Sequence, residues 1–172
     1  MTARMEMLVD TLIEDARWDG LDLPALAETA AHAVLSDLGL AAEGFEISLL
    51  GCADDRIAVL NADFRGKPAP TNVLSWPAQE RGAAEDGGAP DRPAPGMAQM
   101  PESLGDIAIA YETCLREAFD QGKPARDHVI HLLVHGVLHL LGYDHMRNRD
   151  AALMEQAEIR ILAQLGIANP YE

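Results

Sequence analysis

Apolar and polar positions recur along this chain with the two periods of regular secondary structure. Alternating or short apolar runs, the first of them imperfect, predict strands at 6–13, 45–52, 73–76 and 104–110. Apolar stripes at helical spacing, most of them bounded by Pro or Gly, predict helices at 24–38, 55–64, 111–121, 124–141 and 149–165. For the second helix, Asp54 or Asp55 is the candidate N-terminal cap. This mixture indicates an α+β fold, in which about five helices pack on a small mixed sheet.

Segment 78–101 has neither period and is rich in Gly, Ala and Pro, with scattered charges. We expect it to be a mobile surface insertion. The alternative, a linker between two domains, is weak because neither flank resembles a complete domain. The chain of 172 residues therefore predicts a single domain, 1–172, that is long enough for a substantial core.

Composition also indicates the cellular compartment in which the protein works. No apolar run approaches the length of a membrane span, and residues 1–15 are acidic rather than arranged as a secretion signal. We therefore expect a cytoplasmic location. Cys52 and Cys114 are far apart in sequence, which favours buried thiols in a reducing compartment over a disulfide.

The formal net charge of −15 argues against a nonspecific coat for nucleic acid, because phosphate binding depends on basic patches. It does not exclude a small basic cleft. The stretch 61–81 differs from the acidic remainder, since it carries Arg65, Lys67 and Arg81 against two acidic residues.

The strongest chemical signal is the run HGVLHLLGYDH at 135–145. His135 and His139 are four residues apart in a predicted helix, so their imidazoles lie on one face within reach of one metal ion. Gly142 is able to adopt positive φ and end the helix, which lets the chain turn and bring His145 back to the pair. Three neutral imidazoles with one open position are typical of a catalytic zinc shell. The run therefore predicts a zinc site at the C-terminal end of this helix.

Other assignments compete with this one. His131 precedes His139 by about 12 Å along a helix axis, whereas Zn–N bonds are about 2.0–2.1 Å long, so a wholly helical ligand set does not fit one ion. His32, alone in an alanine-rich helix, is predicted to be structural or exposed. Asp144 has two roles open to it: accepting a hydrogen bond from a ligand's far ring nitrogen, or capping the next helix. The alternative for the whole run is a buried helix with satisfied imidazoles.

The residue after the first histidine separates this run from zinc peptidases. Their pattern, HExxHxxGxxH, has the same spacing but places a Glu general base where this chain has Gly136. Because glycine has no side chain that could accept or donate a proton, peptide hydrolysis by the usual route is disfavoured. A metal ion lowers the pKa of bound water by itself, and an anionic substrate such as a phosphodiester would need a nearby cation. The arginines are therefore the next candidates.

Four motifs together resemble the YbeY endoribonucleases, a family of bacterial rRNA maturation factors. They are the histidine run, NADFRGK at 61–67, PTNVLSWP at 70–77 and LGDI at 104–107, and they occur in the family's order. The resemblance extends from about position 55 to the C-terminus. Trp76 stands where the family usually has Phe, and the insertion between Pro77 and Leu104 is longer than in many relatives.

The resemblance implies a zinc-dependent, single-strand-specific endoribonuclease that acts in maturation of the small-subunit (16S) rRNA 3′ end and in ribosome quality control. Carried over by position, the metal ligands fall on His135, His139 and His145, and the functionally important arginine falls on Arg65. Without the resemblance, Arg65 would be a surface arginine or an ion-pair partner. With it, Arg65 would stabilise charge on the phosphoryl group, and Lys67 would help bind the RNA backbone. The attacking group could be a metal-activated water or the ribose 2′-hydroxyl.

The expected partners are single-stranded RNA, above all rRNA, and a ribosome or ribosomal protein; neither DNA nor a membrane is expected. An acidic surface fits docking onto a basic ribosomal protein. One zinc ion is expected, although histidine ligands also suit nickel, copper and iron. Two other functions stay open: a zinc peptidase or amidase, and a non-catalytic ribosome assembly factor with a structural metal. A structural zinc usually has four protein ligands, and the run supplies three.

Overall fold

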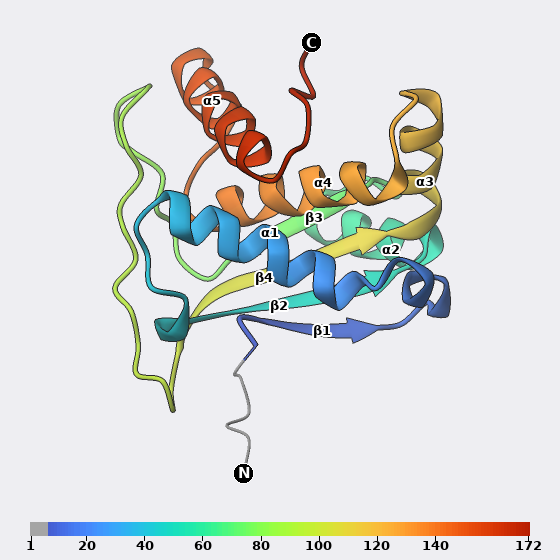
Figure 1. The fold of residues 1–172 in the computed structure, drawn as a ribbon, viewed down its shortest axis with the longest axis horizontal. Helices are drawn as coiled ribbons and strands as arrows, with labels where there is room; N and C mark the ends of the chain where they lie inside the picture. The colour runs from blue at the N-terminus through green and yellow to red at the C-terminus, as the bar shows by residue number, and fades with distance from the viewer. Residues whose placement is uncertain (1–6) are drawn as a thin grey trace.

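A four-stranded mixed sheet lies at the centre of the computed structural model, which describes residues 7–172 (Figure 1). Its strands are β1 (Val9–Ile13), β2 (Phe45–Cys52), β3 (Val73–Pro77) and β4 (Glu102–Ala110). Their order in the sheet is β1-β2-β4-β3; the first three of these run parallel, and β3 pairs antiparallel with β4 at the edge. The predicted α+β fold with a small mixed sheet is confirmed. Glu6, where the first predicted strand begins, lies outside the described residues, and Met7 and Leu8, which that prediction includes, lie before the observed strand.

Five α-helices and two short 3₁₀ helices complete this part of the chain. The α-helix bounds agree with the prediction to within one residue, because Pro and Gly mark most of the ends. The 3₁₀ helices, η1 (Ala16–Leu21) and η2 (Ala42–Gly44), are too short to show a period and have no predicted counterpart. The α-helices are α1 (Leu23–Asp37), α2 (Asp54–Arg65), α3 (Tyr111–Asp120), α4 (Ala125–Leu140) and α5 (Asn148–Gln164).

The predicted cap of α2 is wrong. The N-cap residue is Ala53, and no side chain caps this end. Asp54 lies in the first turn, where its carboxylate accepts hydrogen bonds from the backbone N–H and the hydroxyl of Thr113, at 3.0 and 2.8 Å. Asp55 also lies inside the helix. The acidic residue that the pattern assigned to a local cap instead joins α2 to α3.

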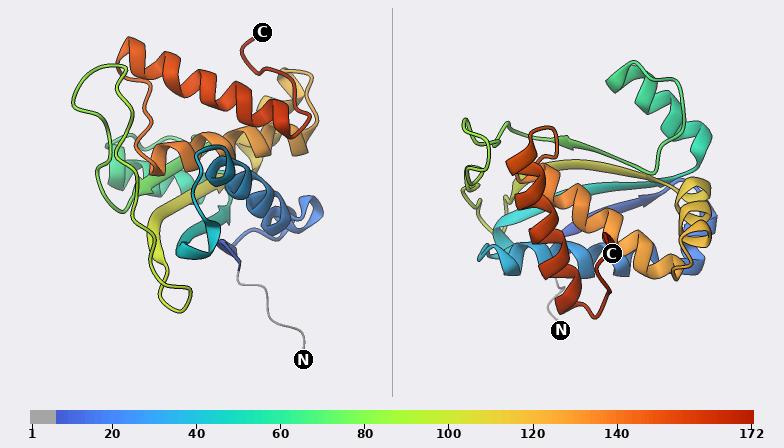
Figure 2. Two further views of the ribbon diagram at one scale, coloured as in Figure 1. Left: turned by 60° about the vertical axis from the view of Figure 1, so that its left-hand side comes forward. Right: turned by 90° about the horizontal axis from the view of Figure 1, so that it is seen from above.

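The helices cover the two faces of the sheet unequally (Figure 2). The larger apolar cluster lies between the sheet, α1 and α4, and a smaller cluster lies beneath α2 on the opposite face. α5 packs against α4 from the outer side. Ten of the 16 residues of α4 are buried as a result. The histidine-bearing helix is therefore enclosed on both sides and is well placed to hold side chains rigidly.

The packing of α4 gives Gly136 a structural role. A Cβ at this position would lie 3.2 Å from the Cδ1 atom of Ile107 on β4, which is tighter than ordinary contact. Glycine thus lets the helix approach the sheet closely at the point where zinc peptidases carry their Glu. None of the helices within residues 7–172 is long and apolar enough to cross a membrane.

Segment 78–101 connects β3 to β4 and lies along one side of the molecule (Figures 1 and 2). Arg147, just before α5, donates hydrogen bonds to two of its carbonyl groups, at 2.8 and 3.0 Å. Within the segment, Arg92 donates to the carbonyl of Leu38, at the end of α1, at 2.7 Å. These contacts attach the segment to both helices, and its mobility stays a prediction.

Candidate metal centre

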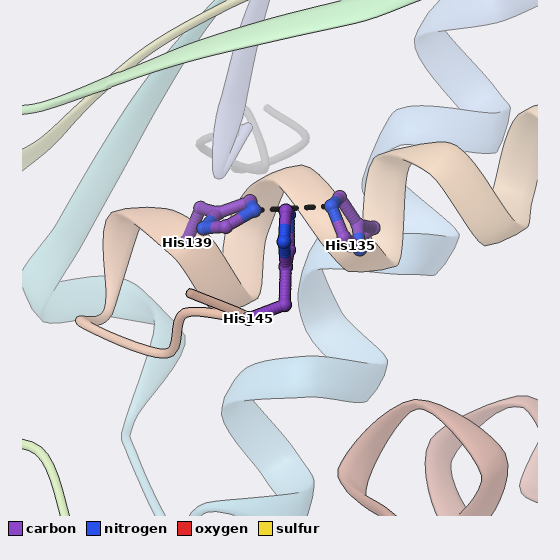
Figure 3. Close-up of side chains that lie close together, drawn as sticks. All are labelled: His135, His139 and His145. Carbon is purple, nitrogen blue, oxygen red and sulfur yellow. Dashed lines mark hydrogen bonds between the residues drawn. The ribbon is translucent and has the colours of Figure 1, made fainter. Parts of the chain in front are cut away.

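Three histidine side chains meet at the C-terminal end of α4. His135 and His139 lie one turn apart, and their Nε2 atoms are 3.0 Å from each other. Gly142, with a φ of +99°, reverses the chain after the helix and lets His145 return to the pair. One ring nitrogen from each residue lies within 4.8 Å of the others, and Figure 3 shows the three rings converging. The residues that the spacing predicted as a set are therefore brought together.

In His135 and His139, the Nδ1 atom, which lies on the side of the ring away from the other histidines, forms a hydrogen bond. Nδ1 of His139 donates to the carbonyl oxygen of Tyr143 at 2.9 Å. Nδ1 of His135 donates to the carboxylate of Glu158 on α5. An imidazole whose Nδ1 carries the proton presents a free lone pair on Nε2. Both rings are thus oriented so that Nε2 is the atom offered to a metal ion.

Glu158 is a completely buried carboxylate behind the three histidines. It also accepts a hydrogen bond from the hydroxyl of Tyr171 and lies 3.5 Å from Nε2 of His131. Burial raises the pKa of Glu158, but its interactions with His131, His135 and Tyr171 outweigh burial and lower the pKa to about 2. The group is therefore charged at neutral pH. A charged partner on Nδ1 increases the basicity of the His135 ring as a ligand.

The donor set fits a transition-metal ion. Burial, together with the neighbouring rings of His135 and His145, lowers the pKa of His139 to about 4. His139 is thus neutral at pH 7, the form in which histidine binds metals. No other His, Cys, Asp or Glu joins the group anywhere in the described chain. The shell would therefore keep an open side, as catalytic zinc sites do and structural ones do not.

The three histidines line a cavity of about 400 Å³, and Arg65 at the end of α2 lies on the same wall. Gly66, with a φ of +69°, ends α2 directly after this arginine. None of the ion pairs that arginines form with carboxylates among residues 7–172 involves Arg65. The Arg65 guanidinium is therefore available to bind an anion. Lys67 follows in the loop and is not among the lining residues. The structure therefore brings Arg65, but not Lys67, to the cavity of the histidines.

Sequence reasoning missed Glu158 and Tyr171. The signal for Glu158 was present, because this acidic residue interrupts the apolar stripe of α5 between the buried Met154 and Ile161. A charge at a core position is rarely tolerated unless it is paired. No comparable pattern marks Tyr171, which lies past the end of α5 and reaches Glu158 only through the fold.

The remaining candidates have structural contacts. Asp144 takes neither of its two expected roles, since its carboxylate accepts a hydrogen bond from the N–H of His145 at 2.7 Å and the α5 cap is Arg147. His131 faces Glu158 and lies outside the group of three. His32 is exposed, as expected, and lies 3.3 Å from a carboxylate oxygen on its own helix.

Comparison with known proteins decides the family. The family model described as Endoribonuclease YbeY matches residues 11–166 of this chain. The chain belongs to the YbeY endoribonuclease family. The resemblance carried by the four motifs is thereby confirmed, and it extends into the N-terminal part that has little sequence signature of its own.

Relatives in the YbeY family match over nearly the full length. The Endoribonuclease YbeY of Cereibacter sphaeroides is 62% identical over 167 residues, which cover 97% of this chain and 100% of that one. The corresponding protein of Paracoccus denitrificans is 58% identical, with 95% and 89% covered. The solution structure of TM1509 from Thermotoga maritima has a TM-score of 0.53 at 18% identity and covers 92% of this chain and 91% of that one, which shows a similar fold.

We predict that Glu158→Gln weakens metal binding while the protein stays folded. The substitution keeps the shape of the side chain but removes the charge that fixes His135, and loss of such a partner typically costs about 10–100-fold in affinity. Competition with a chromogenic chelator measures the metal dissociation constant. Glu155→Gln, on the exposed side of the same helix, is the matched control. Equal affinities for the two variants would show that Glu158 does not support a metal site.

Proposed function

We propose that this protein is a zinc-dependent endoribonuclease that cuts single-stranded RNA at the site formed by His135, His139 and His145. One observation carries the proposal. Three histidines with an open side share a single cavity with Arg65, which has no carboxylate partner in the described chain, in a member of the YbeY family. Three imidazoles suit zinc, and also nickel, copper or iron, so the metal has to be measured in the purified protein.

Each residue of the site would have its own role in cleavage of a phosphodiester. A bound metal ion would supply Lewis acidity and lower the pKa of a water molecule. Arg65 would bind two phosphate oxygens with its planar fork of N–H donors and stabilise the charge that grows on the phosphoryl group. Tyr143 and Glu158 would keep the helical ligands oriented through their far nitrogens. Lys67, outside the cavity wall, would contact the RNA backbone further along the strand.

A peptidase function has less support from the same site. The general base of zinc peptidases would occupy position 136, where this chain has a glycine packed against Ile107. A non-catalytic assembly factor with a structural metal would be favoured by a closed shell of four protein ligands. The group found among residues 7–172 has three.

We extend the proposal to the biological role that the family resemblance implies: maturation of the 16S rRNA 3′ end and ribosome quality control, in the cytoplasm. The net charge of −15 does not favour capture of free RNA. Docking onto a basic ribosomal protein would bring this acidic protein to its RNA instead. Salt-sensitive association with a ribosomal protein supports this extension, and absence of association at low salt contradicts it.

His139→Ala is predicted to abolish RNA cleavage. End-labelled single-stranded RNA is incubated with the wild type and the variant, purified side by side, with and without a chelator. We expect the wild type to cut, the chelator to stop it and zinc to restore it. The variant should lose more than the roughly 100-fold that removal of an outer partner costs. His32→Ala, at an exposed histidine on α1, controls for loss of an imidazole. Equal cutting by wild type and His139→Ala would exclude this metal site.

Arg65→Ala is predicted to lower kcat by about 10²–10³-fold with little effect on metal content, because it removes donors to the reacting phosphate. Arg65→Lys should recover only part of the rate, since lysine provides a point charge without the planar fork. Arg126→Ala, an exposed arginine in the first turn of α4, is the control for loss of one positive charge. An Arg65→Ala enzyme with wild-type kcat would remove Arg65 from the reaction.

A further inference from the structure

A second cavity, of about 380 Å³, adjoins the metal cavity. The two share Ser75, His139, Asp144 and Met146 on their walls. On its other sides, the second cavity is formed by the first part of segment 78–101 and by the start of α5. A strand that lies over the histidines is therefore able to continue from one cavity into the other.

Arg81 is a buried arginine on the wall of this second cavity. It is only 7% exposed, and its Nε atom is buried with no hydrogen-bond partner. Its guanidinium takes part in none of the ion pairs among residues 7–172. Arginine stays charged at every physiological pH, and a buried charge without a partner is costly. An anion in the cavity would remove this cost.

Arg147, on the same wall, differs from Arg81 because its guanidinium is paired within the protein. Its Nε donates to Asp150 at 2.6 Å, and its two other nitrogens donate to backbone carbonyls of segment 78–101. Asp150 is occupied in turn, since it also accepts a hydrogen bond from the N–H of Gly87 at 2.8 Å. The remaining carboxylates of the cavity, on Glu80 and Asp144, are exposed and form no ion pair with Arg81.

The position of Arg81 is fixed by its backbone. A Cβ on Gly142 would lie 2.7 Å from the carbonyl carbon of Arg81, so the two chain segments are in close contact. The carbonyl oxygen of Arg81 also accepts a hydrogen bond from the N–H of Asp91 at 2.8 Å. Arg81 is thus held against the turn that leads from His139 to His145, although it belongs to the inserted segment.

We propose that Arg81 binds a backbone phosphate of the RNA strand next to the phosphate that is cut, so that the strand passes from Arg65 across the histidines to Arg81. This inference rests on the proposed endoribonuclease function. It assigns to segment 78–101 a subsite for a second phosphate, on the side of the metal centre away from α2. Arg65 and Arg81, the two arginines of stretch 61–81, then act at opposite ends of one cleft.

Salt-dependent binding tests this subsite separately from catalysis. The zinc-loaded wild type and Arg81→Gln are titrated against a fluorescent single-stranded 2′-O-methyl RNA, checked on a gel to stay intact, between about 50 and 200 mM salt. We expect Arg81→Gln to bind about tenfold more weakly. The slope of log affinity against log salt should fall by about 0.7, the value for one phosphate contact on a single strand.

Matched variants keep the test decisive. Arg81→Lys retains the charge and should keep the slope, whereas Arg126→Ala loses a remote charge and should leave slope and affinity unchanged. Thermal unfolding shows whether each variant is folded; if Arg81→Gln is not, the comparison of wild type with Arg81→Lys and Arg81→Met replaces it. A folded Arg81→Gln or Arg81→Met protein with the wild-type slope overturns the proposal.

Inorganic phosphate distinguishes the source of the anion. If calorimetry shows that free phosphate binds the wild type as tightly as the oligonucleotide, and Arg81→Gln abolishes this binding, the site takes a free anion and the strand proposal is overturned. RNA cleavage is scored in a separate assay. Failure of the wild type to cut therefore counts against the proposed function, while the difference in salt slope between the wild type and Arg81→Gln reports on Arg81.

Discussion

Gly142 ends α4 with a φ of +99°, a backbone conformation that residues other than glycine rarely adopt. The backbone of Arg81 fills the space where a Cβ on Gly142 would lie. The turn at this glycine returns His145 to His135 and His139. It also places the Tyr143 carbonyl where it accepts the hydrogen bond from His139. The same close contact holds the inserted segment beside the histidines. Metal geometry and the shape of the cleft therefore depend on one residue that cannot carry a side chain.

The second support of the site comes from far along the chain. Glu158 lies on α5, and its buried carboxylate orients His135 through a hydrogen bond between residues 23 apart. Tyr171 donates a hydrogen bond to the same carboxylate, and Nε2 of His131 lies 3.5 Å from it. Packing of α5 onto α4 is thus a condition for a preorganised site as well as for the apolar core. Ligand histidines are generally held in this way by partners on their second nitrogen.

Local patterns predicted most of the fold and the histidine group. Helical spacing of His135 and His139, followed by a glycine and His145, is a local feature, and the structure follows it. The contacts that the pattern missed are long-range ones. Asp54 binds Thr113 on α3 instead of capping its own helix, and Glu158 reaches His135 only because α5 folds back over α4. From the sequence, Arg81 belongs to a stretch that is less acidic than the rest of the chain, but only the fold shows that it is buried beside a cavity.

The proposed chemistry depends on a metal ion held by three histidines with an open side. X-ray absorption at the metal edge of the zinc-loaded protein tests this most directly, on the wild type and on His145→Ala. We expect three imidazole nitrogens at about 2.0–2.1 Å and at least one exchangeable oxygen in the wild type, with one imidazole fewer in the variant. A shell of four protein ligands, or an identical shell in His145→Ala, would contradict the account.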